Sequence, residues 1–447
     1  MSTGRPVMQM FARSSLQMAL LYAASTGLSF LSGVVVANLL GATGYGLYAI
    51  ALSISTLAGL AAEFGLPTLA MREAGRGLAT GEWGLLKGLV AWSDRAILLL
   101  CMLIVLAVAT LASLGLIDAR HGLLRVLPFG LLLIPFVSIG KVRAFALLGL
   151  DHVLASQLPV VVGRPLLFIA GCGGAWLVWE RIDPAMAMAA QAASAACAMV
   201  VSLVLYRRLR PAALVKASPD RDVRAWLESC VPMAMTEGLR LLQGQLALLL
   251  VGLLAGVAQA GTYRVADAVS QVTLVLVSAI ATAGTPMFAR LHAAGDREGL
   301  QNLASLCTIA MLGGAFIVGL PIALWGDHLI PFVFGSNFAS SAALFRILWG
   351  GLLVSAMLGM PLSIANMTGH HALSTRSFLI MGMVNASLGA LLIPHFGAAG
   401  GALATSAALL IATTYCSLRL HAATGIDTTL YGLRHIHKKA SVTGRKL

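Results

Sequence analysis

The chain has 447 residues, of which 59% are hydrophobic and only 11% are charged, and its formal net charge is +13. A soluble domain carries about 25% charged residues, so this composition excludes an ordinary solvated surface. The apolar residues come in long blocks, and the block from Leu98 to Leu116 is apolar around nearly the whole helix. A helix of a soluble bundle is apolar along one stripe only. We therefore predict an all-α polytopic membrane protein, in which excess Lys and Arg mark cytoplasmic loops rather than a nucleic-acid partner.

Twelve apolar blocks predict twelve transmembrane spans, because about 20 apolar residues suffice to cross the bilayer as a helix. The first six spans are expected at residues 16–39, 45–66, 96–117, 123–147, 153–178 and 185–206. The second six are expected at residues 229–255, 261–286, 303–325, 341–366, 374–394 and 398–420. The first block is too long for the core of a signal peptide, so it should remain as a span. Very short turns near 41–44 and 256–261 imply antiparallel neighbouring helices.

The placement of Lys and Arg predicts the orientation of the spans. With the N-terminus inside, the external loops hold only Arg120, Arg125 and Arg181, and the cytoplasmic segments hold most of the rest. Because cytoplasmic loops accumulate Lys and Arg, we expect both termini in the cytoplasm. Residues 72–95 mix Trp and Leu with charged residues, which predicts an amphipathic helix on the cytoplasmic leaflet.

A polar and basic linker divides the chain into two halves of six spans each. The predicted division is an N-terminal lobe at 1–206, a cytoplasmic linker at 207–228, a C-terminal lobe at 229–420 and a basic cytoplasmic tail at 421–447.

The two halves share spaced motifs, which indicates an internal duplication. Gly41-Ala-Thr-Gly-Tyr-Gly-Leu-Tyr48 opens the second span, and Gly256-Val-Ala-Gln-Ala-Gly-Thr-Tyr263 opens the eighth. The offsets between echoed positions are 215 (41 to 256), 215 (48 to 263), 219 (67 to 286) and 220 (149 to 369). Repeats with an even number of spans are parallel, so we predict two parallel six-helix bundles around a central cavity. Such paired bundles are a transporter architecture.

Four runs of residues carry a resemblance to a known family. They are Asn38-Leu-Leu-Gly-Ala-Thr-Gly-Tyr-Gly-Leu-Tyr-Ala49, Glu63-Phe-Gly-Leu-Pro67, Met71-Arg-Glu-Ala-Gly75 and Phe396-Gly-Ala-Ala-Gly-Gly-Ala402. With these runs the chain resembles the oligosaccharide (polysaccharide biosynthesis, Wzx-like) flippases of the multidrug/oligosaccharidyl-lipid/polysaccharide (MOP) exporter superfamily. The resemblance covers the whole chain in span count, length and loop pattern.

The resemblance implies a substrate, a location and partners. The implied substrate is an undecaprenyl-diphosphate-linked oligosaccharide, moved by alternating access across the bacterial inner membrane for O-antigen, capsule or exopolysaccharide synthesis. The implied fold is MATE-like, with two six-helix bundles around a cavity. We expect the chain to be a monomer. Its expected partners are membrane lipids, a polysaccharide polymerase and a chain-length regulator.

Charged residues inside predicted spans are candidates for function, because a charge in a membrane interior is costly. The candidate substrate-binding residues of a cationic cavity are Arg164, Arg240, Arg264 and Arg346. Arg164 and Arg240 are expected nearest mid-depth, and a strong loss of transport is predicted for Arg240→Ala. Glu237 and Asp267 are candidate ion-coupling residues. Each lies three residues from an arginine, so simple self-neutralising pairs are the competing interpretation.

Nothing in the sequence predicts an enzyme, a cofactor or a metal site. The six cysteines lie in or beside apolar blocks without a CxxC pair, and no nucleotide-binding loop of the GxxxxGK[ST] type is present. Three alternatives stay open, one of which is a scramblase or a lipid-carrying structural partner. An ion-coupled drug or metabolite antiporter of the same superfamily would need a less cationic cavity and a buried carboxylate. A membrane-embedded glycan polymerase or ligase would need a large external loop with catalytic residues.

Overall fold

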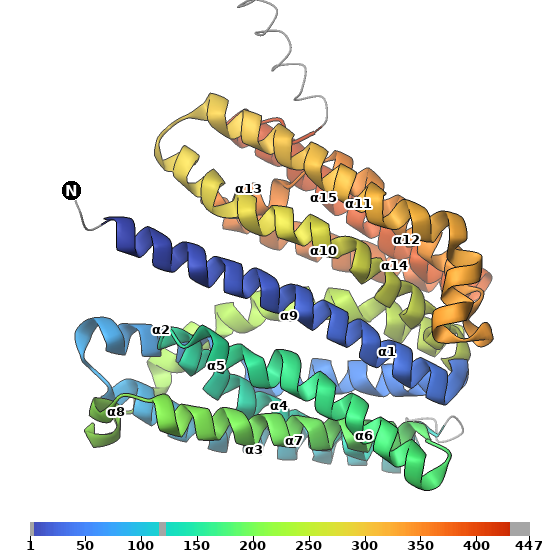
Figure 1. Ribbon diagram of the computed structural model, residues 1–447, viewed down its shortest axis with the longest axis horizontal. Helices are drawn as coiled ribbons and strands as arrows, with labels where there is room; N and C mark the ends of the chain where they lie inside the picture. Colours follow the sequence, from blue (N-terminus) through green and yellow to red (C-terminus); the bar gives the residue numbers. More distant parts are fainter. Residues whose placement is uncertain (1–3, 116–121, 430–447) are drawn as a thin grey trace, which may run out of the picture. The chain divides into compact units, whose positions relative to one another are not determined.

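The computed structural model describes residues 4–115 and 122–429, which are helical apart from short turns and contain no strand (Figure 1). The helices up to the middle of the chain are α1 (Gly4–Glu63), α2 (Leu66–Thr80), α3 (Gly84–Ser113), α4 (Leu123–Gly149), α5 (Val153–Leu158), α6 (Arg164–Trp179), α7 (Pro184–Leu209), α8 (Ala212–Lys216) and α9 (Val223–Leu254). The remaining helices are α10 (Val257–Ala293), α11 (Arg297–Phe334), α12 (Ser341–Met357), α13 (Pro361–Met367), α14 (His371–Phe396) and α15 (Ala398–Thr424). A π-helical turn at Pro159–Gly163 joins α5 to α6, and a 3₁₀ turn at Ser336–Phe338 precedes α12.

The predicted spans correspond to helices of the structure. Within the described residues, ten helices are long and apolar enough to cross a membrane, and the bent pair α12–α13 raises the number to eleven. That number treats α1 as one helix, although α1 contains the first two predicted spans on either side of a break at Gly41. The chain is therefore a multi-pass membrane protein. Residues 430–447, which hold most of the predicted basic tail, lie outside the described residues.

Glycine allows the chain to turn at both predicted short connections. Gly41 has φ 65° and ψ −178°, and Gly256 has φ 94° and ψ 165°. Residues with a Cβ rarely adopt such positive φ values, so glycine is the residue that lets one span end and the next begin without a loop. The two glycines are 215 residues apart, as the predicted repeat requires (41 to 256).

The internal contacts of the chain divide it into two compact units, Met1–Leu241 and Leu242–Leu447. We call these unit 1 and unit 2. The division lies within α9, whereas the sequence placed it in the linker before that helix. The lobe boundaries inferred from the linker stay a prediction.

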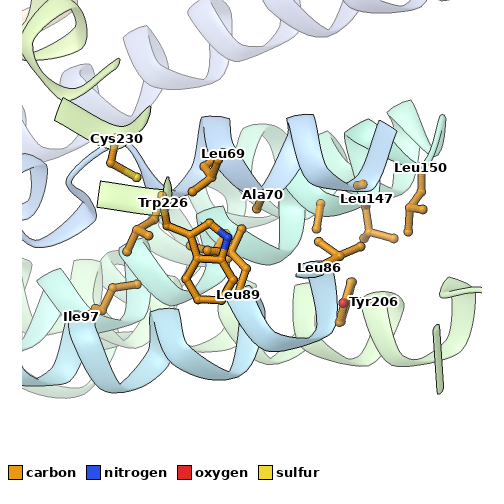
Figure 2. Close-up of a cluster of buried hydrophobic side chains, with 14 of the residues drawn as sticks. Leu69, Ala70, Leu86, Leu89, Ile97, Leu147, Leu150, Tyr206, Trp226 and Cys230 are labelled. Atoms are coloured by element: carbon orange, nitrogen blue, oxygen red, sulfur yellow. The ribbon is translucent and has the colours of Figure 1, made fainter. Parts of the chain in front are cut away.

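The core of unit 1 includes the segment expected to lie on the leaflet surface. Figure 2 shows Leu69 and Ala70 of α2 beside Leu86 and Leu89 of α3, with side chains of α4, α7 and α9 around them. The prediction of one amphipathic helix over 72–95 is wrong. The chain breaks at Gly81, and Leu86 and Leu89 are fully buried in protein rather than facing lipid. A core-facing helix and a membrane-surface helix have the same amphipathic pattern, so sequence alone did not separate them.

Unit 2 has its own core, built around Phe288, Met311, Ile364 and Cys416. These residues come from α10, α11, α13 and α15, so four helices of the unit share one apolar cluster.

Candidate functional site

The backbone departs from regular α-helix directly before Arg164. The peptide N–H of Arg164 donates to the carbonyl of Pro159, five residues earlier, which closes a π-helical turn. Pro165 follows at once, and a proline inside a helix clashes with the carbonyl four residues before it, here Val161. We attribute the wider turn to this clash. Turns of this kind occur frequently at functional sites, and this one lies in the middle of the span Val153–Trp179.

The side chain of Arg164 lacks an anionic partner in the described part of the chain. Its Nε atom is buried and has no hydrogen-bond partner. The ion pairs within the described residues join other arginines to carboxylates and do not include Arg164. An uncompensated guanidinium at mid-span is costly in a membrane protein, which makes it a candidate for binding an anionic ligand.

Buried aromatic rings fix the helix that carries Arg164. Phe168 lies one turn after Arg164 on α6, and its ring stacks on Tyr48 of α1 at 6.1 Å between centroids. Tyr48 stacks in turn on Tyr45 at 6.3 Å. All three side chains are buried, so the start of α6 is held against α1 by packing. On the neighbouring helix α7, the buried Oε1 atom of Gln191 has no hydrogen-bond partner.

The other three candidate arginines are paired with carboxylates. Arg240 lies 2.6 Å from Glu237, and Arg264 lies 2.8 Å from Asp267. The pairing expected at a spacing of three residues is therefore confirmed for both. Roles of these four residues in substrate binding or ion coupling stay predictions.

Arg346 is paired across two helices. Its guanidinium contacts the carboxylate of Asp327 and donates from Nε to the carbonyl of Ala323 at 2.9 Å. Asp327 and Ala323 are on α11 and Arg346 is on α12, so the pair also fastens two helices of unit 2. The helical spacing that predicted the other pairs could not predict this one.

Two further ion pairs of unit 1 were not predicted. Glu63 is buried and accepts a hydrogen bond from Lys141 at 2.9 Å. Arg143 contacts Asp94 through both terminal nitrogens. The partners lie 78 and 49 residues apart, so no local pattern in the sequence signals them.

Several amide side chains of the described spans differ in their hydrogen bonding. Gln243 and Asn385 each have a buried side-chain atom without a partner, and Gln271 lies 3.5 Å from Asp267. Within the described residues there is no group of three His, Cys, Asp or Glu side chains that could hold a metal ion.

Comparison with known proteins identifies the family and the fold. Residues 11–292, well over half of the chain, match the family described as polysaccharide biosynthesis protein. A probable low-salt glycan biosynthesis flippase, Agl15 of Haloferax volcanii, is 23% identical over 37% of this chain. The match spans about a third of that curated relative, 35% of its length.

Solved structures share the fold at low sequence identity. An inward-facing multidrug resistance MATE family transporter of the MOP superfamily matches with a TM-score of 0.71 and 14% identity, over 89% of this chain and 95% of its own. The lipid II flippase MurJ in an inward closed conformation matches with a TM-score of 0.70 and 13% identity, over 90% of this chain and 87% of its own. The fold is thus that of MOP superfamily transporters. On the family match, the chain belongs to the polysaccharide biosynthesis protein family.

Proposed function

We propose that this protein is a flippase for a polyprenyl-diphosphate-linked oligosaccharide, with undecaprenol as the carrier, in the synthesis of a cell-surface polysaccharide. The family match and the flippase relative support the class of function. The observation that carries the proposal is Arg164, a mid-span guanidinium without a carboxylate partner among the described residues. A diphosphate esterified at both ends is an anion, and it needs a cation when it enters a medium of low dielectric constant.

Arginine suits this task better than lysine. Its planar guanidinium stays charged and presents a fixed fork of donors that matches phosphate oxygens. The π-helical turn and the stacked rings of Tyr48 and Phe168 hold the start of α6 in place before a ligand arrives. Binding would then require little reorganisation of the protein. We rank Arg164 first among the four arginines, and Arg240, Arg264 and Arg346 after it because each already has a carboxylate partner.

The paired carboxylates offer a way to couple transport to an ion gradient. When a diphosphate approaches Arg240 or Arg264, Glu237 or Asp267 would lose its partner and could then accept a proton or a cation. We place the protein in the bacterial inner membrane with both termini in the cytoplasm, acting as a monomer by alternating access. A polysaccharide polymerase and a chain-length regulator would use its product.

Transport in proteoliposomes tests the proposal. Purified protein is reconstituted with a fluorescent undecaprenyl-diphosphate oligosaccharide, and probe in the outer leaflet is quenched chemically. The expected result is protein-dependent movement of the probe between leaflets, and a loss of that movement in Arg164→Ala. The matched control is Arg207→Ala, which removes an exposed arginine at the end of α7 that is not a candidate for substrate binding.

Two outcomes contradict the proposal. One is equal transport by wild type and Arg164→Ala. The other is the exchange of a cationic drug for protons without movement of the glycolipid, which would favour an antiporter of the same superfamily.

A further inference from the structure

The chain folds back after the sixth predicted span in each half. In unit 1 this segment is Arg210–Asp222, which follows α7 and contains the short helix α8. In unit 2 it is Gly425–Thr429, which follows α15. We call these the first strap and the second strap. Neither is a membrane span, and the first was predicted to be a plain linker.

The first strap is held on the start of α3, the third predicted span. Nζ of Lys87 donates to the carbonyls of Val215 at 2.7 Å and Ala217 at 2.8 Å. The peptide N–H of Asp220 donates to the carbonyl of Gly84 at 3.0 Å. Leu214 is only 2% exposed and belongs to the core cluster of unit 1. The strap is therefore part of the packed unit.

Gly88 shows how closely the first strap approaches α3. A Cβ atom at this position would lie 1.7 Å from the backbone oxygen of Asp220, a distance that the backbone cannot tolerate. The contact therefore requires a residue without a side chain at position 88, which makes Gly88 a place to release the strap by substitution.

The second strap is held on α11, the third predicted span of its half. Gln301 donates to the carbonyl of Asp427 at 2.7 Å and accepts from its N–H at 2.9 Å. Thr308 donates to the carbonyl of Thr428 at 3.0 Å, and the Thr428 hydroxyl lies 2.9 Å from Ser417 of α15. Ile426 belongs to the core cluster of unit 2, as Leu214 does in unit 1.

The two straps occupy equivalent places in the internal repeat, although their sequences differ. Their first residues are 215 positions apart (210 to 425). Their anchoring residues are 217 positions apart (84 to 301) and 220 apart (88 to 308). These values lie within the range of 215 to 220 found for the repeated motifs. Each strap thus joins the end of the sixth helix of its half to the beginning of the third.

We propose that the straps are permanent clasps that keep the third and sixth helices of each half together at their predicted cytoplasmic ends throughout the transport cycle. At these cytoplasmic ends, the third and sixth helices of each half then move together. The entrance for substrate therefore does not open by separating these two helices. This inference concerns movement and goes beyond the proposed substrate.

Hydrogen–deuterium exchange, measured by mass spectrometry on the full chain in detergent, tests the docking without any substrate. In wild type, the hydrogen-bonded amides of 211–222 and 425–429, among them those of Leu214, Ala217, Asp220 and Asp427, should exchange at least about tenfold more slowly than amides of unstructured peptides. Gly88→Val should remove this protection from 211–222 only. Gln301→Ala should remove it from 425–429 only. Gly174→Val is the matched control, because nothing lies within 4 Å of the added Cβ. Unprotected straps in wild type would overturn the proposal.

A reversible lock tests whether the clasp is permanent. Gly84→Cys with Asp220→Cys, in a chain whose exposed Cys197 is replaced by Ser, should form a disulfide on mild oxidation. The readout is surface polysaccharide in a strain that depends on this chain, or glycolipid transport in proteoliposomes. Oxidised and reduced protein should be equally active. Activity that is lost on oxidation and restored by reductant would show that the first strap must open, which contradicts a permanent clasp.

Discussion

The two units differ in how completely their candidate intramembrane arginines are paired with carboxylates. In unit 2, Arg264 and Arg346 each lie against a carboxylate, one on the same helix and one on the neighbouring helix. In unit 1, Arg240 is paired with Glu237 on its own helix, but Arg164 follows a π-helical turn and lacks such a partner within the described residues. A carboxylate partner lowers the free-energy cost of inserting an arginine into the membrane. An arginine without such a partner keeps its charge available to a ligand. The paired arginines are therefore neutralised within the fold, whereas Arg164 lowers the stability of the protein and has its charge free for function.

The largest effect is expected at Arg164. Arg164→Ala should lower glycolipid transport by roughly 10- to 100-fold, the range of a lost charge-assisted hydrogen bond of about 1.5–3 kcal/mol. The same change should leave the thermal unfolding temperature unchanged or raise it, because an uncompensated charge is removed. Transport in proteoliposomes and thermal unfolding in detergent check the two parts. Arg164→Lys should keep part of the activity, since the charge remains and the fork geometry is lost. Lower stability of Arg164→Ala would show that Arg164 has a structural partner.

The opposite result is expected in unit 2. Asp267→Ala leaves Arg264 without its carboxylate, and both side chains are about a quarter to a third exposed (26% and 32%). We expect a loss of about 1–3 kcal/mol in stability, below the 3–5 kcal/mol of a fully buried pair because solvent screens part of the charge. Thermal unfolding in detergent measures it. Arg264→Met together with Asp267→Leu should restore most of the loss, and failure to do so would indicate that Arg264 has a further role.

The sequence predicted what depends on local pattern. Spans follow from runs of apolar residues, and the pairs Glu237–Arg240 and Arg264–Asp267 follow from helical spacing, so both could be predicted. The pairs Glu63–Lys141 and Asp327–Arg346 depend on which helices become neighbours, and no local signal reports that.

The straps and the turn before Arg164 were also missed. Polar linkers usually carry no structure, and the docking of the first strap depends on glycines on a helix more than a hundred residues earlier. The sequence places two prolines around the 159–165 segment, but it does not say whether the helix responds with a kink or with a π-helical turn.

A smaller effect is now expected at Arg240 than the sequence alone predicted. Arg240 forms an ion pair with Glu237, and both side chains are largely exposed, at 58% and 42%. An exposed pair contributes about 0–1 kcal/mol to stability, so Arg240→Ala should leave unfolding nearly unchanged. Transport should fall less than in Arg164→Ala, because Glu237 offsets the charge of Arg240 toward an anionic substrate. Parallel transport assays of the two variants decide the order. A larger loss for Arg240→Ala would move the main anion site to α9.

The smallest effect tests whether the π-helical turn matters as well as the charge. Pro165→Ala supplies the missing N–H and removes the ring that clashes with the carbonyl of Val161, so the segment can return towards regular α-helix. Losing the wide turn changes the register between α5 and α6, and the residues before the turn would rotate relative to Arg164 and to the rings packed on α1. The charge is retained, so we expect a transport loss of roughly two- to fivefold, equivalent to about 0.4–1 kcal/mol. Stability should rise slightly because a proline leaves a helix interior. Normal transport with higher stability would show that the turn only accommodates Pro165, and that the function of this site depends on the guanidinium alone.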